Sequence, residues 1–484
     1  MVFPIAGGTQ DTGYEISNSL RFNEPDGAHL SRTPSSAGNR KTWTFSCWIK
    51  RSGLQAHVGD FQAFFTAGSG NDRDEFFWEA SNGHFDKLSW FGNYGGTTYG
   101  VRTSSVFRDV SAWYHVVWVG DTTQGTEANR LKVYINGTQQ TLTEFNSGFL
   151  SQNTDMYFNN TTEHEIGSYT GETQHFAGYM SEIHHIDGQA LDPTYFAETN
   201  DNGVWIPKKY TGSYGTNGFF MEFKQTGTSA NSSGMGADTS GNDHHFTPSN
   251  LAATDVTVDT PTNNFATLNP LQTRTYPTLA EGNLVQTGHS SSDSAGIGAT
   301  IMPASGKWYA EAKVPNISSA SEGYPHFGIT DTSLLSTRGT QGTKIAAGFK
   351  INDAASVTNT NILGTTTLTN TNWPSWSDND IINFALDLDN RKLYIGKNGT
   401  YINSGDPAAG SNHQITWANS TEISLILAGY SVSSGSGGGG DDTSWNYGNP
   451  AFSISSGNAD ANGYGNFEYA PPSGYYALCT KNLA

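Results

Sequence analysis

The stretch WTFSCWIKRS, residues 43–52, places an apolar side chain at every second position. This alternation is the pattern of a β-strand that buries one face. It predicts a strand whose buried face carries Trp43, Phe45, Cys47 and Ile49. The run WYHVVWVGD, residues 113–121, is apolar on both faces, which predicts a strand in the middle of a sheet.

A hairpin signal follows in RLKVYINGT, residues 130–138. Asn136 and Gly137 tolerate a positive φ at both central positions of a two-residue turn, so this dipeptide predicts a tight hairpin. The same arrangement recurs in RKLYIGKNGT, residues 391–400, after the alternating run DIINFALDLD, residues 380–389. The repetition predicts two antiparallel sandwiches of related topology.

The composition favours the same fold class and excludes several functions. Of 484 residues, 56 are Gly, 12% are aromatic and only 14% are charged, which favours strands and turns over surface helices. The net charge of −19 argues against binding to nucleic acid and against docking on an anionic membrane surface. No apolar run reaches the length of a membrane span and the first residues lack a secretory signal pattern, so we expect no membrane insertion. Cys47 and Cys479 are expected to be reduced thiols in the core.

Several motifs fall in the order found in laminin-G-like, concanavalin-type sandwiches. They are NSLRFNEPDGAHLSRT, WTFSCWIKRS, WYHVVWVGD, RLKVYINGT and FAGYMSEIHHIDGQAL, all within residues 16–200. Residues 281–484 resemble a SPRY domain through GKWYAEAKV, HFGITD, NFALDLDNRKLYIGKNG and WNYGNPAF. The two together, joined by a segment like WIPKKYTGSYGTNGFFMEF, resemble structural proteins of marine tailed phages, notably tail fibres and capsid-attached fibres.

The resemblance implies an all-β chain of two jelly-roll-like sandwiches, at residues 16–200 and 281–484, joined by a strand-bearing connector at 201–280. It implies a bacteriophage virion protein, assembled in the host cytoplasm, that acts as a fibre or spike and forms a homotrimer. Its lectin-like domains would attach the particle to a host-surface glycan. Residues 1–15 are expected to anchor the chain to other virion proteins. Two alternatives stay open: a capsid or tail decoration protein that binds no receptor, and a depolymerase of surface glycan.

Motifs for catalysis or metal binding are weak. Glu163 and Glu165 stand two residues apart, on one face of an expected strand, but Ser168 occupies the position of the third acid of concanavalin-type glycanases. His184 and His185 are adjacent on an expected strand and therefore point to opposite faces, so they cannot share one metal ion without a bulge. We expect no enzyme, no cofactor and no bound metal. Calcium is left open, because no clear Asp pair matches the laminin-G calcium sites.

Two aromatic stretches are candidates for sugar contact. Residues 90–100, WFGNYGGTTYG, and residues 372–380, NWPSWSDND, are expected to form rim loops where aromatic faces lie beside Asn, Asp and Gly. The candidate ligand-binding residues are Trp90, Tyr94, Tyr99, Trp373 and Trp376. The alternative is that these rings pack within the sandwich wall or against sister subunits. If the N-terminal arm is proximal, the second domain faces outward with its Gly-rich loop at 435–444.

Overall fold

The computed structural model describes residues 13–54, 61–80, 83–169, 174–272, 278–287, 297–315, 326–329, 347–350, 367–368, 374–417, 428–430 and 443–483. The chain divides into two compact units. The N-terminal unit extends to Asn264, and the C-terminal unit runs from Phe265. Within the described residues the only α-helix is α3, Thr480–Leu483, so the predicted all-β class is confirmed.

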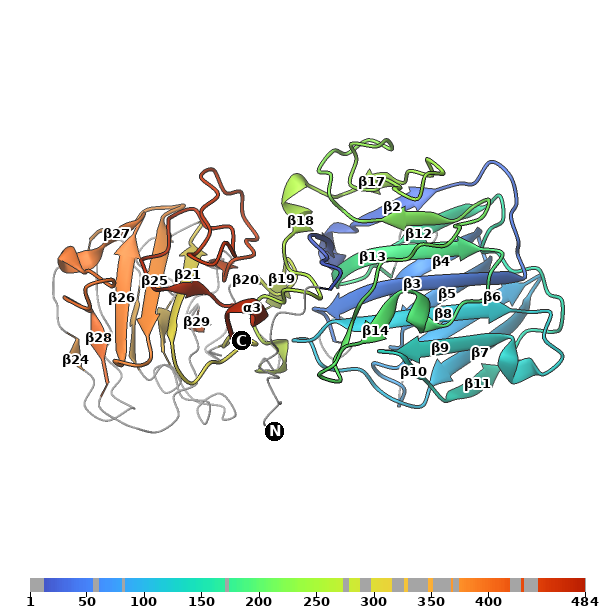
Figure 1. The fold of residues 1–484 in the computed structure, drawn as a ribbon, viewed down its shortest axis with the longest axis horizontal. Helices are drawn as coiled ribbons and strands as arrows, with labels where there is room; N and C mark the ends of the chain where they lie inside the picture. The colour runs from blue at the N-terminus through green and yellow to red at the C-terminus, as the bar shows by residue number, and fades with distance from the viewer. Residues whose placement is uncertain are drawn as a thin grey trace, which may run out of the picture. The chain divides into compact units, whose positions relative to one another are not determined.

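Two eight-stranded antiparallel sheets form most of the N-terminal unit (Figure 1). Sheet A has the order β10-β9-β8-β3-β13-β1-β18, with β16 also paired to β13. Its strands are β1 Ser19–Phe22, β3 Thr42–Arg51, β8 Tyr114–Asp121, β9 Leu131–Ile135, β10 Thr138–Gln139, β13 Gly178–Asp187, β16 Phe219–Met221 and β18 Val256–Thr257.

Sheet B has the order β11-β7-β6-β5-β4-β12-β2-β17. Its strands are β2 His29–Arg32, β4 Gln62–Ser69, β5 Asp72–Trp78, β6 Leu88–Tyr94, β7 Thr97–Thr103, β11 Leu142–Asn146, β12 Glu163–Ile166 and β17 Thr247–Ser249. A separate hairpin joins β14 Ala197–Thr199 to β15 Trp205–Pro207. Short 3-10 helices lie at Glu24–Asp26, Glu127–Asn129, Pro193–Tyr195 and Ala253–Asp255.

Aromatic side chains fill the core between sheets A and B. Phe45 on β3 stacks on Phe65 on β4 with ring centroids 4.5 Å apart, and Trp118 on β8 stacks on Phe76 on β5 at 4.8 Å. The predicted buried face of β3 is confirmed, because none of its members is exposed: Trp43, Phe45, Cys47 and Ile49. Both cysteines of the chain are buried thiols that form no disulfide, as expected.

Both Asn-Gly hairpins are confirmed. Asn136 and Gly137 have φ values of 48° and 79° in the turn between β9 and β10. In the C-terminal unit, Asn398 and Gly399 have φ values of 47° and 81° between β26 and β27. The two units therefore use the same turn, in which Asn and Gly both take the left-handed conformation.

The predicted connector, residues 201–280, is mostly part of the N-terminal unit. Its strands β16, β17 and β18 pair with β13, β2 and β1. A buried ion pair of 2.7 Å between Lys50 Nζ on β3 and Asp259 Oδ2 fixes its later part to sheet A. The boundary between units thus lies after residue 264 rather than after residue 200. The strand expected in this connector is present as β16, whereas β17 and β18 are too short for an alternating pattern to stand out in the sequence.

The end of the predicted anchoring arm also belongs to the N-terminal unit. Residues 1–12 lie outside the described residues. Tyr14, near the end of the arm, packs against a small buried cluster that contains Ile16, Trp48 and Trp113. Since Cys47 and Ile49 point into the sandwich core, Trp48 and its cluster cover the outer face of sheet A.

The C-terminal unit contains a ten-stranded sheet and a three-stranded sheet. The larger sheet consists of β19 Thr278–Ala280, β20 Val285–Thr287, β21 Lys307–Lys313, β24 Thr367–Leu368, β25 Ile381–Asp387, β26 Lys392–Lys397, β27 Thr400–Tyr401, β28 Ile415–Thr416, β30 Thr443–Asn446 and β31 Tyr476–Ala477. The smaller sheet consists of β22 His326–Ile329, β23 Ala347–Lys350 and β29 Ala428–Tyr430. Two 3-10 helices lie at Pro270–Gln272 and Ile402–Ser404. Phe327 on β22 packs on Phe384 on β25 with centroids 5.7 Å apart, so the core again lies between two sheets.

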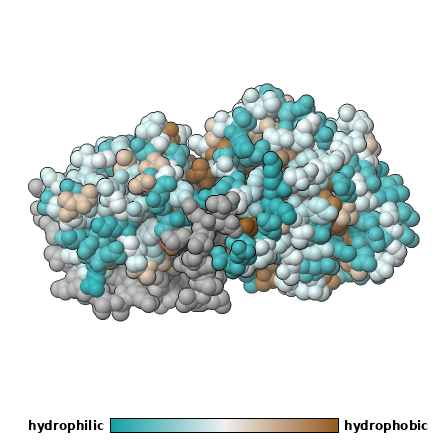
Figure 2. Space-filling view, viewed as in Figure 1, coloured by the Kyte–Doolittle hydropathy of each residue, from teal (hydrophilic) through white to brown (hydrophobic). Residues whose placement is uncertain are grey.

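Hydrophobic side chains are scattered over the surface that Figure 2 shows, among hydrophilic ones. The large hydrophobic residues that the described part of the chain exposes are Phe85, Val106, Tyr195, Val204, Val258 and Leu271. Single exposed residues of this kind are ordinary in soluble domains and mark no site by themselves.

Candidate functional site

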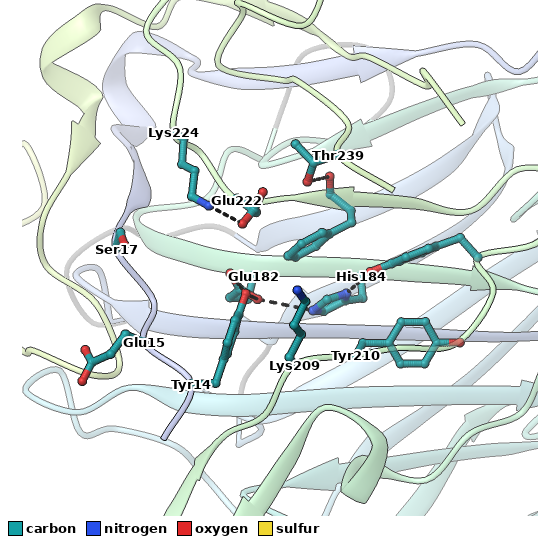
Figure 3. A pocket seen from close by; sticks show the side chains of 12 residues that line it. Tyr14, Glu15, Ser17, Glu182, His184, Lys209, Tyr210, Glu222, Lys224 and Thr239 are labelled. Carbon is teal, nitrogen blue, oxygen red and sulfur yellow. Dashed lines mark hydrogen bonds and ion pairs between the residues drawn. The ribbon is translucent and has the colours of Figure 1, made fainter. Parts of the chain in front are cut away.

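A cavity of about 340 Å³ opens beside sheet A, within the N-terminal unit. Four parts of that unit line it: the segment before β1, the middle of β13, the segment after β15, and β16 with the residues that follow (Figure 3). The lining residues are Tyr14, Glu15, Ser17, Glu182, His184, Lys209, Tyr210, Tyr214, Phe220, Glu222, Lys224 and Thr239. We call this cavity the Glu182 pocket.

The pocket lies on the outer face of sheet A. Ile183 on β13 and Phe219 on β16 belong to the sandwich core. Their neighbours His184 and Phe220 are paired across the two strands and therefore point to the opposite face. The strands β13 and β16 thus contribute one set of side chains to the core and the other set to the wall of the pocket.

A β-bulge positions Glu182. The pairing of β13 with β3 shifts register between Ser181 and His184, and Glu182 has a φ of 49°. Bulges of this kind redirect a side chain locally. The Glu182 side chain is only 7% exposed, and the Tyr14 hydroxyl donates to its two oxygens at 3.2 and 3.1 Å. His184 Nε2 lies 3.6 Å from Glu182 Oε2.

Aromatic rings form the rest of the wall. The His184 ring stacks on Phe220 with centroids 4.2 Å apart and planes 6° apart, and its Nδ1 is hydrogen-bonded to the Tyr214 hydroxyl at 3.0 Å. Burial raises the pKa of Tyr14 and of Tyr214 above the ordinary value, and the negative charge of Glu182 raises both further. Both phenols are therefore protonated at neutral pH, and their hydroxyls are hydrogen-bonded to Glu182 and to His184.

The charged side chains of the pocket are mixed. Glu222 and Lys224 form an ion pair of 2.5 Å at one side (Figure 3). Glu15 and Lys209 also line the pocket, and both residues are exposed. Carboxylate acceptors, ammonium and phenol donors, and ring faces in one cavity can hold a ligand that carries both hydroxyls and apolar C–H surfaces.

The predicted contact stretch at residues 90–100 is a hairpin of β6 and β7 rather than a rim loop. Trp90 is fully buried in the sandwich core, and its Nε1 donates to Asp74 Oδ1 at 3.0 Å. The Tyr94 hydroxyl donates to the same oxygen at 2.6 Å. The partly buried Tyr99 ring packs against Tyr94 edge to face at 6.0 Å. Trp90 has no free ring face to offer a sugar, because the core covers both.

Asp74 explains why these rings turn inward. The carboxylate is fully buried, and the Tyr157 backbone N–H also donates to it at 2.6 Å. Burial raises the pKa of Asp74 to about 7, although the hydrogen bonds from Tyr94, Tyr157 and Trp90 act in the opposite direction. The sequence shows a strand ending in aromatic residues but not the buried acid that holds them.

The second predicted contact stretch falls partly outside the described residues. Trp373 lies outside them. Trp376 is 5% exposed and belongs to the core of the C-terminal unit, with Lys397 Nζ 5.6 Å from the centroid of its ring. Of the Gly-rich loop at 435–444, only the residues that begin β30 are described.

The carboxylates considered for catalysis differ in environment. Glu163 is exposed, whereas Glu165 is buried and accepts the Ser168 hydroxyl. His184 and His185 point to opposite faces, as predicted: His184 faces the pocket, and His185 is hydrogen-bonded to Asn159 Oδ1 at 2.8 Å in the core. Within the described ranges, no group of three His, Cys, Asp or Glu side chains could hold a metal ion.

The helices of the same part of the chain include none long and apolar enough to cross a membrane.

The residues of the Glu182 pocket were missed as a group by the sequence analysis. A signal was present, since WIPKKYTGSYGTNGFFMEF, residues 205–223, supplies Lys209, Tyr214 and Phe220. Nothing in the sequence indicates that this segment folds back beside residue 182.

The fold of the N-terminal unit permits a comparison with known proteins. Residues 25–194 match the model of the Concanavalin A-like lectin/glucanases superfamily. The match lies inside the predicted laminin-G-like block, residues 16–200, and supports a lectin-like fold for that part of the chain. The search of curated proteins found no match to this chain.

Solved structures resemble the chain only in general fold. A heptameric SAP-like pentraxin from Limulus polyphemus is 16% identical, covers 37% of this chain and 80% of its own, and has a TM-score of 0.27. The SPRY domain of human HERC1 is 14% identical, covers 34% of this chain and 87% of its own, with a TM-score of 0.24. The LG1-3 region of the laminin alpha2 chain is 6% identical, covers 91% of this chain and 63% of its own, with a TM-score of 0.32. Similarity at this level carries no argument about ligands or activity.

Proposed function

We propose that this chain is a virion protein of a tailed bacteriophage, a fibre or spike that attaches the particle to a host-surface glycan through the Glu182 pocket. The observation that carries the proposal is the cavity of about 340 Å³, in which carboxylates and phenols lie beside aromatic rings on a lectin-like sandwich. The volume is that of a small ligand site, near the lower end of the usual range of about 300–1,000 Å³.

The phage assignment rests on the sequence resemblance, in which a laminin-G-like block precedes a SPRY-like block. With it we propose anchoring through the part of the N-terminal arm that precedes Tyr14, a homotrimer, and a location in the virion. We propose that its folded units face the host and carry the recognition site.

We propose binding without catalysis. Retaining and inverting glycosidases both need two carboxyl groups that can reach one glycosidic bond. Glu163 and Glu165 differ in access, and the Ser168 hydroxyl is bonded to the buried member of the pair. The pair formed by Glu163 and Glu165 therefore gives no support to hydrolysis.

The test uses the fluorescently labelled full-length chain on host cells and on isolated host polysaccharide. We expect labelling that falls about ten-fold or more in Glu182→Gln, because the substitution removes the central charged acceptor while keeping the side-chain shape. Glu198→Gln is the matched control, since Glu198 lies on β14, pairs with Lys208 and does not line the pocket. Absence of labelling by the unmodified chain would favour a decoration protein. Release of reducing sugar from the polysaccharide would instead favour a depolymerase.

A further inference from the structure

We infer that the Glu182 pocket selects neutral sugar rings and rejects sugars that carry a carboxylate, such as sialic and uronic acids. The inference rests on the proposed glycan binding and specifies the chemical class of its ligand. It follows from how the charges of the pocket are paired.

The negative charges of the pocket outnumber its uncommitted positive charges. The lining contains Glu15, Glu182 and Glu222, against Lys209 and Lys224. Lys224 is held by Glu222 at 2.5 Å. An acidic sugar would therefore meet the buried carboxylate of Glu182, and Lys209 is the lining ammonium group that Glu222 does not hold.

Glu182 contributes most of the repulsion because it is the least hydrated of these groups. Its side chain is 7% exposed, and the partner that reaches both oxygens is the neutral phenol of Tyr14. Like charges repel most strongly where water is excluded, so a ligand carboxylate beside Glu182 would make the free energy of binding much less favourable. A sugar hydroxyl at the same place would donate a charge-assisted hydrogen bond instead.

Lys209 supplies the complementary donor. It is exposed on the lining and makes no ion pair within the described part of the chain, whereas the adjacent Lys208 pairs with Glu198 at 3.3 Å. An ammonium donor and a carboxylate acceptor together match the donor and acceptor character of sugar hydroxyls. The Phe220 ring, fixed by its stack on His184, offers a surface for the C–H face of a sugar.

The net negative charge of the whole chain also disfavours acidic ligands. A net charge of −19 lowers the local concentration of anionic ligands around the molecule, an effect that falls with ionic strength. The selection by the pocket differs from this general effect, because it depends on individual lining residues and persists at high salt.

The test compares matched oligosaccharides bound to the full-length chain by isothermal titration. Each neutral oligosaccharide is paired with a form that carries one added sialic or uronic acid. We expect at least one neutral member to bind, and its acidic counterpart to bind about ten-fold more weakly or worse. In Glu222→Gln, which frees Lys224, we expect the acidic form to gain at least about three-fold relative to the neutral form. Glu198→Gln should leave the ratio unchanged.

The outcomes separate this inference from the proposed function. Equal or tighter binding of the acidic forms would overturn the selection while leaving glycan binding intact. An unchanged ratio in Glu222→Gln would also overturn it, since removing one lining carboxylate and releasing Lys224 would then have no effect on how acidic sugars bind. If the chain binds no member of the panel and no host polysaccharide, both the proposed function and the inference fail.

Discussion

The β6–β7 hairpin and the Glu182 pocket contain the same kinds of side chain and use them differently. In the hairpin, Trp90 and Tyr94 donate to Asp74, which is fully buried. In the pocket, Tyr14 donates to Glu182 beside a cavity of about 340 Å³. Aromatic donors around a carboxylate therefore occur both in a closed core and beside an open cavity. The difference lies in whether the packing leaves room beside the acid.

The largest effect is expected from Trp90→Ala. Removing this fully buried indole leaves a void in the sandwich core and a donor missing at Asp74, so the free energy of unfolding should fall by about 3–5 kcal/mol. Chemical denaturation followed by tryptophan fluorescence measures the loss. Glycan binding by the remaining folded protein should be unchanged; a selective loss of binding at normal stability would make Trp90 a ligand contact after all.

The free energy of unfolding is expected to depend on pH through Asp74, the buried acid of the β6–β7 hairpin. The pKa of Asp74 is about 7 in the folded protein against an ordinary value of 3.8. Between these pH values the folded state retains a proton that the unfolded state has released. The contribution of Asp74 to stability is thus full below about pH 4, decreases as the pH rises, and is lost above about pH 7.

Urea unfolding at several pH values checks this expectation, with Asp74→Asn as the variant that cannot titrate. The difference between the two curves should fall with rising pH, by at most about 1.4 kcal/mol per pH unit. A flat difference between pH 4 and pH 7 would show that Asp74 is ionised throughout and that its three donors outweigh the cost of burial.

On the pocket side, Tyr14→Phe removes one hydroxyl and keeps the ring. The two oxygens of Glu182 lose their phenol donor, so the free energy of unfolding should fall by about 0.5–1.5 kcal/mol. Denaturation gives the change, and Tyr195→Phe, at a tyrosine that is 50% exposed, is the control. An effect no larger than that of the control would mean that the segment before β1 does not hold Glu182 in place.

The smallest effect is expected from Tyr99→Leu, which removes a ring at the edge of the hairpin. The side chain is only partly buried, and leucine retains apolar bulk against Tyr94, so stability should change by about 1 kcal/mol or less. Titration with the preferred glycan should give the affinity of the unmodified chain. A marked loss of affinity here, with normal binding in Glu182→Gln, would move the site from the pocket to the hairpin.

The sequence predicted the features of the fold that depend on local patterns. The alternation in β3 and the Asn136-Gly137 and Asn398-Gly399 turns are each contained within a few residues, and all three are present. A strand within residues 201–280 was predicted and is present as β16, but the pairing of β16 with β13 and of β17 with β2 could not be predicted in the same way, because those partners lie far away in the sequence.

The pocket escaped prediction for a related reason. Glu182 lies within a run that matches an ordinary closing strand, and its orientation depends on a bulge in the pairing with β3. Tyr14 and Phe220 reach it from segments separated by most of the unit. The aromatic stretch at residues 90–100, in contrast, has the composition of a sugar-binding loop but is drawn into the core by the buried Asp74, which lies on another strand.

The ion pair between Lys50 and Asp259 sets the order in which this unit can mature during synthesis. The lysine on β3 is made early, but its partner, and the strand β18 that pairs with β1, are among the last parts of the unit to leave the ribosome. At about 5–20 residues per second, several seconds pass between the completion of the lectin-like motifs and the arrival of Asp259. During that interval the nascent chain lacks Asp259 beside Lys50 and leaves β1 as an open sheet edge, a feature that makes folding intermediates prone to aggregate. A gene fragment that stops at residue 200 would make that transient state permanent.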